Sequence, residues 1–203
     1  MKKDPFNLNY ETILYEGHNL YAPDQIYDTV SNGINPHLVK WFFSQDLNKF
    51  FLNRTVVDAG SGLGRFIPLI SFFKPKKIIS LEPIEHLIEK QKIFCTRKFL
   101  FLSNKPILSN IEYYNLKIED FLNSEKNFDT LCLIQVLPHI DINKVLENSK
   151  VKNLFIISYI EHASQTNLLV KLLKNKFTYN FYDISNEKIW DVDKKHFMIT
   201  ALR

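Results

Sequence analysis

The sequence predicts one α/β domain, in which a parallel β-sheet carries helices on both faces. Short apolar stretches alternate with segments of helical spacing along most of the chain, and helices in such an alternation connect parallel strands. A glycine-rich turn at residues 60–64 follows the first apolar stretch and precedes a helical pattern. With 203 residues, of which 45% are hydrophobic, the chain can bury one sizeable core.

The composition argues against several other classes of protein. No stretch reaches the ~18 apolar residues of a membrane-spanning helix, and the start of the chain lacks an apolar signal core, so we expect a cytoplasmic protein. Cys95 and Cys132 lie in apolar surroundings without ligand-like spacing, which predicts two buried thiols and no metal site. The net charge is +4, and the densest basic run, residues 74–77, is more typical of a solvated turn than of a phosphate-binding patch.

Residues 1–34 are expected to form an N-terminal appendage rather than an independent domain. They show no sustained period and carry turn signals at residues 22–24 and 32–33, so short helical pieces and loops are predicted, with a substrate lid as one interpretation. Tyrosines of this segment either line a substrate pocket or pack the appendage on the core; they are Tyr10, Tyr15, Tyr21 and Tyr27.

Residues 35–203 form the predicted α/β domain. Asn35 and Pro36 are typical of a helix start, and this helix is expected to continue to about Phe51. Apolar runs predict strands at 55–59, 78–82, 111–116, 128–135, 153–159, 177–183 and 196–202. Helical spacing predicts helices at 65–73, 84–99, 142–148 and 164–175, while residues 118–121 are placed after the third strand. The last two strands are expected to close the sheet as an antiparallel pair.

The glycine-rich turn predicts a small-molecule site. Gly60, Gly62 and Gly64 let the main chain approach a ligand closely and take a positive φ. A nucleoside-triphosphate loop requires Gly-Lys-Ser/Thr, but Arg65 follows the last glycine, which excludes that class. The spacing is G-x-G-x-G instead of the G-x-G-x-x-G of dinucleotide folds.

Two carboxylates at the ends of predicted strands narrow the choice of ligand. Asp58 would repel a pyrophosphate at this place, whereas it would attract a cationic amino acid and a sulfonium. Glu82 is placed to accept hydrogen bonds from both hydroxyls of a ribose, which dinucleotides also contain. The pattern therefore favours S-adenosylmethionine over NAD.

The turn at residues 58–64, together with Glu82 and the neighbourhood of Asp120, resembles the class I S-adenosylmethionine-dependent methyltransferases over residues 53–203. The resemblance implies a Rossmann-like, seven-stranded mixed sheet whose last strand is antiparallel, with S-adenosylmethionine as the cofactor.

A narrower resemblance links the chain to the protein N-terminal α-amino methyltransferases. It is carried by residues 62–65, 118–121, 133–141 and 200–203. It implies that Arg65 holds the cofactor carboxylate, that Glu82, Pro83 and Ile84 meet the ribose, that Ile118 and Glu119 meet the adenine, and that Gln135 touches the methionine portion. That family holds the substrate amine with an Asp-Asn or Glu-Asn pair after the fifth strand, where this chain has residues Ser158 to Glu161. The resemblance therefore extends to the cofactor-binding residues and not to the substrate-binding ones.

A methyl group on a sulfonium is already activated, so the protein has to hold a nucleophile in line with it. An amine nucleophile must also be neutral, which an acid or a histidine at the site can arrange. The first catalytic candidate is Tyr159, at the end of the fifth strand, and the second is His139. Further candidates at the same edge of the sheet are Asp141, Glu161 and His162.

The predicted function is SN2 transfer of a methyl group from S-adenosylmethionine to an amine or hydroxyl of a peptide or small metabolite, with α-amino N-methylation slightly favoured. No Asn/Asp-Pro-Pro-Tyr motif follows the fourth strand, which counts against methylation of base amino groups. Two alternatives stay open, an RNA methyltransferase and a regulatory protein that binds the cofactor without catalysis. The sequence leaves the acceptor and the oligomeric state open.

Overall fold

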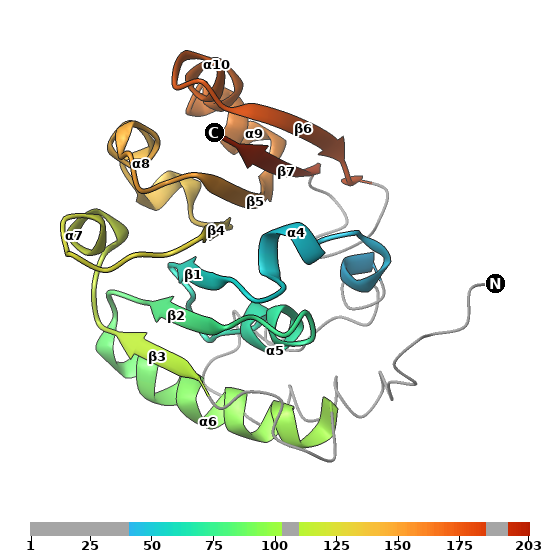
Figure 1. Ribbon diagram of the computed structural model, residues 1–203, viewed down its shortest axis with the longest axis vertical. Coiled ribbons are helices and arrows are strands. Elements are labelled where there is room, and N and C mark those ends of the chain that lie inside the picture. Colours follow the sequence, from blue (N-terminus) through green and yellow to red (C-terminus); the bar gives the residue numbers. More distant parts are fainter. Residues whose placement is uncertain (1–40, 103–109, 186–194) are drawn as a thin grey trace.

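The computed structural model describes residues 41–102, 110–185 and 195–203, and it contains a seven-stranded β-sheet covered by helices (Figure 1). The strands are β1 (Thr55–Ala59), β2 (Lys77–Leu81), β3 (Ile111–Tyr114), β4 (Thr130–Ile134), β5 (Asn153–Tyr159), β6 (Thr178–Asp183) and β7 (His196–Leu202). The helices are α4 (Asn48–Phe51), α5 (Phe66–Ser71), α6 (Glu85–Leu102), α7 (Ile118–Leu122), α8 (Ile142–Glu147), α9 (Ile160–Gln165) and α10 (Leu168–Lys174), with a short 3₁₀ helix, η2 (Leu137–His139).

The strand order is β3-β2-β1-β4-β5-β7-β6. Strands β1 to β5 pair in parallel, and β7 runs antiparallel to both of its neighbours, β5 and β6. This confirms the predicted mixed sheet with an antiparallel last strand. After β1 the chain builds one half of the sheet and then returns to add β4 on the other side, so the strand order reverses between β1 and β4. In open α/β sheets, ligands bind at the carboxyl ends of the strands at such a reversal.

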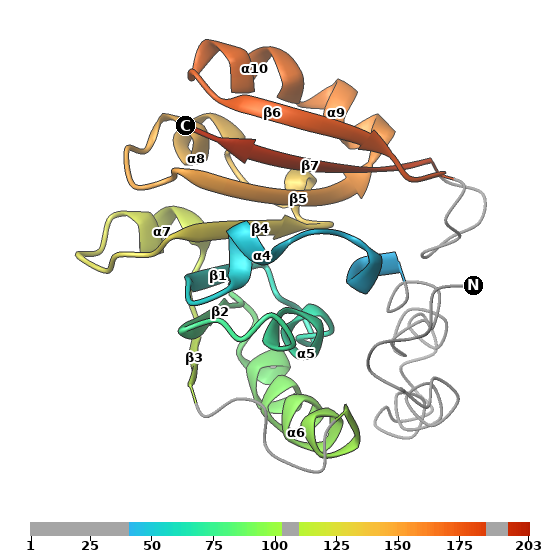
Figure 2. The ribbon, with the colours of Figure 1, turned by 45° about the vertical axis from the view of Figure 1, so that its right-hand side comes forward.

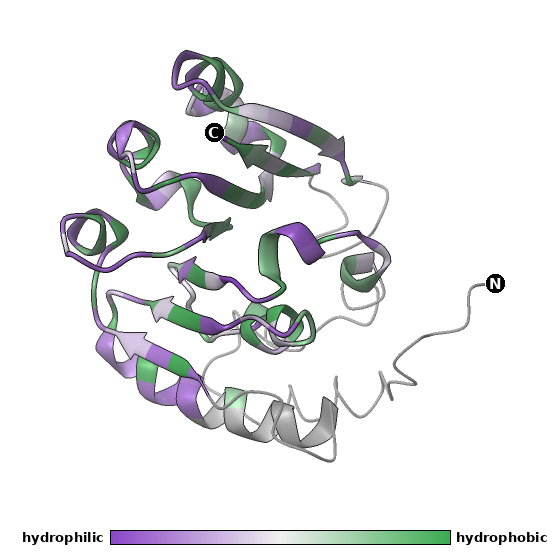
Figure 3. Ribbon diagram, viewed as in Figure 1, coloured by the Kyte–Doolittle hydropathy of each residue, from purple (hydrophilic) through white to green (hydrophobic). Residues whose placement is uncertain are grey.

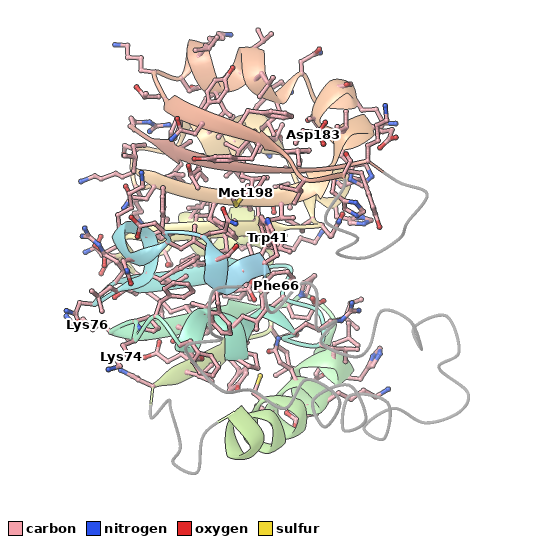
Figure 4. The ribbon with its side chains drawn as sticks, turned by 90° about the vertical axis from the view of Figure 1, so that its right-hand side faces the viewer. Trp41, Phe66, Lys74, Lys76, Asp183 and Met198 are labelled. Atoms are coloured by element: carbon pink, nitrogen blue, oxygen red, sulfur yellow. The ribbon has the colours of Figure 1, made fainter. Side chains whose placement is uncertain are left out.

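One face of the sheet is covered by α4, α5 and α6 (Figure 2). Aromatic rings lie at the centre of the core on this face. Phe42 stacks on Phe51 with ring centroids 6.1 Å apart, and Phe155 of β5 meets both rings edge-on at 5.8 and 5.3 Å. Figure 4 shows Trp41 and Phe66 against the middle of the sheet on this face. These contacts hold α5, and with it the end of the glycine-rich turn, firmly on the sheet.

The opposite face is covered by α7, α8, α9 and α10, which bury aliphatic side chains against it. Leu131 and Leu133 of β4 point to this face, while Cys132 between them points to the other core. Because both faces are covered, all five residues of β4 are buried, and a strand of this kind is apolar throughout. Figure 3 shows the hydrophobic colours of β4 and β7, in contrast to the paler colours of the edge strand β3. Cys95 and Cys132 are both buried thiols, as predicted.

The helix predicted to continue to Phe51 is interrupted, which corrects the sequence-based expectation. Residues 41–44 are helical, and α4 begins only at Asn48. The Ser44 hydroxyl donates to the Trp41 carbonyl at 2.7 Å, and the Gln45 side-chain amide donates to the same oxygen at 3.3 Å. These side chains therefore occupy the carbonyl that a continuing helix would use. The predicted helix start at Asn35 and the appendage of residues 1–34, with its tyrosines, lie outside the described residues.

Two further segments differ from the prediction. Residues 118–121, which the sequence places after the third strand without an assigned element, belong to the helix α7, in which Ile118, Phe121 and Leu122 are buried at helical spacing. The single helix expected at 164–175 is two helices, α9 and α10, separated at Asn167, whose φ of 50° breaks the helical path.

The basic run at residues 74–77 lies in the turn between α5 and β2, except for its last residue, Lys77, which begins β2. Figure 4 shows Lys74 and Lys76 at one end of the strands and Asp183, which ends β6, at the other end. Since β1 to β5 are parallel, the lysines lie at the amino ends of these strands, away from the carboxyl ends where ligands bind in such sheets. No helix within the described ranges combines the length and apolarity needed to cross a membrane.

Candidate ligand-binding site

Two adjoining cavities lie at the carboxyl ends of β1, β2 and β4. The larger has a volume of about 350 Å³ and the smaller about 170 Å³. Gly60 and Gln135 line both cavities, so together they form one two-lobed cleft. The larger lobe is lined mainly by apolar side chains and by Glu82, whereas the smaller is lined by Asp58, Arg65 and the glycine-rich turn.

The turn that separates the lobes depends on its glycines. Gly60, Gly62 and Gly64 all have a positive φ, of 63°, 56° and 73°. A Cβ at Gly60 would lie 2.4 Å from Cγ2 of Val136, and one at Gly64 would lie 2.5 Å from Cγ of Gln91. At Gly62 a Cβ would meet nothing within 4 Å. Glycine is therefore required for space at two positions and for backbone conformation at all three.

A closed ring of three hydrogen bonds, two of them partly buried and one fully buried, supports the turn on the side away from the cleft. The hydroxyls of Ser61 and Ser80 are 2.7 Å apart, the Ser80 hydroxyl donates to Oε1 of Gln91 at 2.8 Å, and Nε2 of Gln91 donates back to the Ser61 hydroxyl at 2.7 Å. Gln91 is fully buried. The three side chains come from the turn, β2 and α6, so the ring ties the ligand-facing backbone to two packed elements.

Glu82 is held at the inner wall of the larger lobe. Its Oε2 accepts the N–H of Gly62 at 2.8 Å and its Oε1 accepts the N–H of Ile84 at 3.0 Å. The residue is only 5% exposed. Each carboxylate oxygen has two lone pairs, so one remains on each oxygen after these bonds. The side chain is thus oriented in advance to accept two hydrogen bonds from a ligand.

Asp58 lies in the smaller lobe on the α5 face of β1. It is 2% exposed, and among the described residues none donates a hydrogen bond to its carboxyl group. Burial, and secondarily the charge of Glu82, raise the pKa of Asp58 to about 7. A positively charged ligand group in this lobe would favour the ionised carboxylate.

Gln135 joins the two lobes in a strained conformation. Its φ of 57° is left-handed, which is uncommon for a residue with a side chain and is concentrated at functional sites. Its Oε1 accepts a bond of 3.5 Å from the Ser158 hydroxyl, which also lies 2.9 Å from Nδ1 of His162. Its Nε2 is buried with no hydrogen-bond partner in the part of the chain that the structure describes. This amide nitrogen is free to donate to a ligand in the cleft.

Comparison with known proteins places this geometry in a fold family. No family model matches the sequence, and no curated protein matches it either. Solved structures do match in three dimensions. The N-methyltransferase NodS from Bradyrhizobium japonicum is 12% identical with a TM-score of 0.60, over 81% of this chain and 93% of that chain. An rRNA methylase from Streptococcus thermophilus is 18% identical with a TM-score of 0.54, over 77% of this chain and 91% of that chain.

The chain has the class I methyltransferase fold. A precorrin 8W decarboxylase from Methanobacterium thermoautotrophicum also matches, with 11% identity and a TM-score of 0.63, over 90% of this chain and 97% of that chain. At these identities the likeness establishes the fold, and the reaction has to be argued from the site.

The cleft of this methyltransferase fold brings together nearly all the residues predicted to hold the cofactor. Arg65 precedes α5 and lines the smaller lobe with Asp58. The larger lobe is lined by Glu82, Pro83, Ile84, Ile118 and Glu119. Gly64 lines neither lobe, since it faces Gln91 and Cys95 behind the turn. Its contribution is to the shape of the turn.

The catalytic candidates are more scattered. His139 ends η2 and lines the larger lobe. Tyr159 lines neither lobe, and its ring packs against His162 and His196 with centroids 5.2 and 4.7 Å away. Asp141 caps α8, because its Oδ1 accepts the N–H groups of Asn143 and Lys144 at 3.1 and 3.3 Å. Glu161 is exposed in the first turn of α9.

Several residues of the site were not predicted. The apolar wall of the larger lobe includes Leu87, Leu116, Val136 and Ile140. Leu87 and Gln91 fall on the buried side of the predicted helix at 84–99, and a glutamine on an apolar face is a signal that could have indicated the hydrogen-bonded ring. The described residues include no group of three or more His, Cys, Asp or Glu side chains that could hold a metal ion.

Proposed function

We propose that this chain is an S-adenosylmethionine-dependent methyltransferase that methylates an amine or hydroxyl of a peptide or small metabolite. The observation that carries the proposal is the placement of two buried carboxylates in separate lobes of one cleft, Asp58 in the smaller and Glu82 in the larger. A cofactor with a cationic amino-acid end and a ribose end matches this division of charge.

The residues of the larger lobe fit an adenosine. Apolar side chains line much of the lobe, among them Ile84 and Ile118, and suit the faces of a flat base. The anchored carboxylate of Glu82 suits a ribose, whose two neighbouring hydroxyls both donate. Glu119 is also fixed at this wall, since its Oε1 accepts the N–H of Asp141 at 2.7 Å.

The residues of the smaller lobe fit the amino-acid end. Asp58 would face the positive charges, and Arg65 from the same lobe would pair with the carboxylate. A pyrophosphate in this lobe would place two negative charges beside Asp58, whose ionisation is already disfavoured by burial and by the charge of Glu82. This is why S-adenosylmethionine is favoured over a dinucleotide.

The mechanism requires the protein to position and shield the reacting groups. When bound, the cofactor supplies a methyl group on a sulfonium, which needs no further activation. Gln135, at the junction of the lobes, would donate from its buried Nε2 to a ligand and fix it at the junction. Holding the acceptor in line with the methyl group supplies up to ~7–11 kcal/mol of the barrier reduction. His139 at the cleft wall is the candidate to accept a proton from an amine acceptor, whereas Tyr159, at the end of β5, lies outside both lobes.

The test is transfer of a labelled methyl group. The full chain is incubated with S-adenosylmethionine labelled in the methyl group and, separately, with pools of peptides, metabolites and RNA. We expect label in the peptide or metabolite pool. A second pair of peptide pools, one with free and one with acetylated N-termini, tests α-amino methylation, because only the free amine can react. Label in RNA alone would favour the RNA alternative, and cofactor binding without transfer to any pool would favour the non-catalytic one.

A further inference from the structure

The end of the sheet formed by β6 carries exposed apolar side chains that the ligand-binding cleft does not use. Among the described large apolar residues that are exposed, Ile84 and Leu116 line the cleft. Most of the others belong to α10, β6 and the end of β7, namely Val170 (67% exposed), Leu173 (63%), Phe181 (40%), Tyr182 (41%) and Leu202 (42%). Phe181 lies on the face of the sheet that α10 covers and Tyr182 on the opposite face, so apolar side chains are exposed on both sides of this end of the sheet. Figures 1 and 2 show α10 and β6 together at this end. Exposed apolar side chains at one end of a molecule are typical of a protein interface.

The backbone of β6 is open for pairing. β6 is the outermost strand and pairs with β7 alone. The N–H of Ile184 donates to the carbonyl of His196 at 3.0 Å, one step beyond the last pair of the ladder. In antiparallel strands the residues that face a neighbour alternate, so Tyr179, Phe181 and Asp183 direct their N–H and C=O groups outward. No described residue hydrogen-bonds to these backbone groups.

The two edges of the sheet differ in charge. On the opposite edge, Glu112 of β3 forms ion pairs with Lys77 at 2.8 Å and Lys126 at 4.0 Å. Charged side chains on an edge strand oppose pairing with another chain. By contrast, β6 carries no charged residue from Thr178 to Tyr182, and only its last residue, Asp183, is charged. The β6 edge therefore lacks the protection that β3 has.

We propose that two copies of the chain pair β6 to β6, antiparallel, around a two-fold axis at Phe181. The outward residues are spaced evenly about Phe181, so this register pairs Phe181 with its own copy and Tyr179 with Asp183 of the partner subunit. About six backbone hydrogen bonds form, two for each directly opposed pair. No like charges face each other, because each Asp183 meets a tyrosine.

The side chains around Phe181 are consistent with this axis. The Phe181 ring already stacks on Phe197, with centroids 5.6 Å apart and planes 13° from parallel, so it is held in place before pairing. Phe197 belongs to the core beneath α10, which places Phe181 on the same face of the sheet. Phe181 thus lies on the face of the sheet that α10 covers, and Val170 and Leu173 of α10 are exposed at the same end of the sheet. A second copy of this chain is the occupant that satisfies the backbone and the side chains together.

Disulfide trapping tests the register directly. In a directly hydrogen-bonded antiparallel pair the Cα atoms are about 5.5 Å apart, which suits a disulfide. We expect mild oxidation of the Phe181→Cys variant to give a covalent dimer in at least half of the chains. The Tyr179→Cys variant should give none, because its two copies are offset by about 13 Å along the strands. Adding Asp183→Cys to Tyr179→Cys should restore the cross-link. Cys95 and Cys132 are buried and do not interfere.

Sedimentation equilibrium of the unmodified chain supplies the second readout. We expect the unmodified chain to have twice its monomer mass of 24.0 kDa. In the double variant Val170→Glu and Leu173→Glu, the dissociation constant of the dimer should rise by at least 100-fold. Leu52→Glu is the control, since Leu52 is equally apolar and 43% exposed but lies after α4. Unfolding by urea confirms that the variants are folded. A monomer at every concentration, or cross-linking of Tyr179→Cys equal to that of Phe181→Cys, would overturn the proposal.

Discussion

The wild-type protein should lose stability as the pH rises because of Asp58, and the Asp58→Asn variant should not show this loss. The pKa of Asp58 is raised from 3.8 to about 7 by burial and by the nearby Glu82. Between these values the folded protein retains a proton that the unfolded chain has lost. The folded state is therefore destabilised progressively from pH 4 to pH 7, and the loss is complete above pH 7.

The size of the effect follows from the shift in pKa. A shift of about three units corresponds to about 4 kcal/mol when the loss is complete. Part of this loss is already present at pH 5, so the change from pH 5 to pH 8 is about 2–3 kcal/mol. Asparagine has nearly the same shape and does not titrate, so Asp58→Asn should lose that much less stability over this range than the wild-type protein.

The assay is urea unfolding of the wild-type protein, Asp58→Asn and a control at pH 5 and pH 8. Asp46→Asn is the matched control, because Asp46 is exposed and distant in the chain from the cleft. Other titrating groups contribute equally to all three proteins, so the differences isolate Asp58. If the free energy of unfolding of Asp58→Asn changes with pH as much as that of the wild-type protein, the buried, proton-retaining Asp58 inferred here is refuted.

Four further substitutions test the geometry of the cleft. Glu82→Ala should weaken binding of S-adenosylmethionine by about 1.5–3 kcal/mol in calorimetry, and unchanged affinity would reject the ribose assignment. Gly62→Ala should cost about 1–2 kcal/mol of unfolding free energy for its left-handed backbone. Gly64→Ala should cost about 1–3 kcal/mol more than Gly62→Ala, because its Cβ would also clash with Gln91. Equal losses of unfolding free energy in the two variants would contradict this crowding at Gly64. Gln91→Leu should cost about 1–3 kcal/mol because it leaves the Ser61 and Ser80 hydroxyls buried with fewer partners, and a neutral result would show that the ring does not support the turn.

The parts of the fold that were predicted correctly are those with a strong local pattern. β1 and β5 have the bounds expected from apolar residues, since both strands are buried on their two faces. The glycine-rich turn was recognised because each glycine stands where a side chain would be strained or crowded. The resemblance to methyltransferases implied a seven-stranded sheet with an antiparallel last strand, but the order of the strands was not predicted, because alternation alone does not specify which strands are neighbours.

The missed features depend on contacts between residues distant in the chain. Gln91 is bonded to Ser80 and Ser61, which precede it by 11 and 30 residues, and although a glutamine on an apolar helix face signals a buried hydrogen bond, no local pattern identifies its partners. The link between Ser158 and Gln135 spans 23 residues and is equally invisible. α7 has only five residues, too few for a periodic signal, and the break between α9 and α10 rests on the left-handed Asn167 alone. Cofactor residues were therefore easier to predict than those that support them.

Calorimetric titration of the full chain with S-adenosylmethionine tests the central claim, that the cleft holds this cofactor with its cationic end at Asp58. The titration is carried out at pH 6 in two buffers of different ionisation enthalpy, with NAD as the competing ligand. We expect one molecule of S-adenosylmethionine to bind per chain with release of close to one proton, because the positive charge ionises an Asp58 whose pKa is about 7. Binding of NAD in place of S-adenosylmethionine, or binding of S-adenosylmethionine without proton release, would contradict the claim.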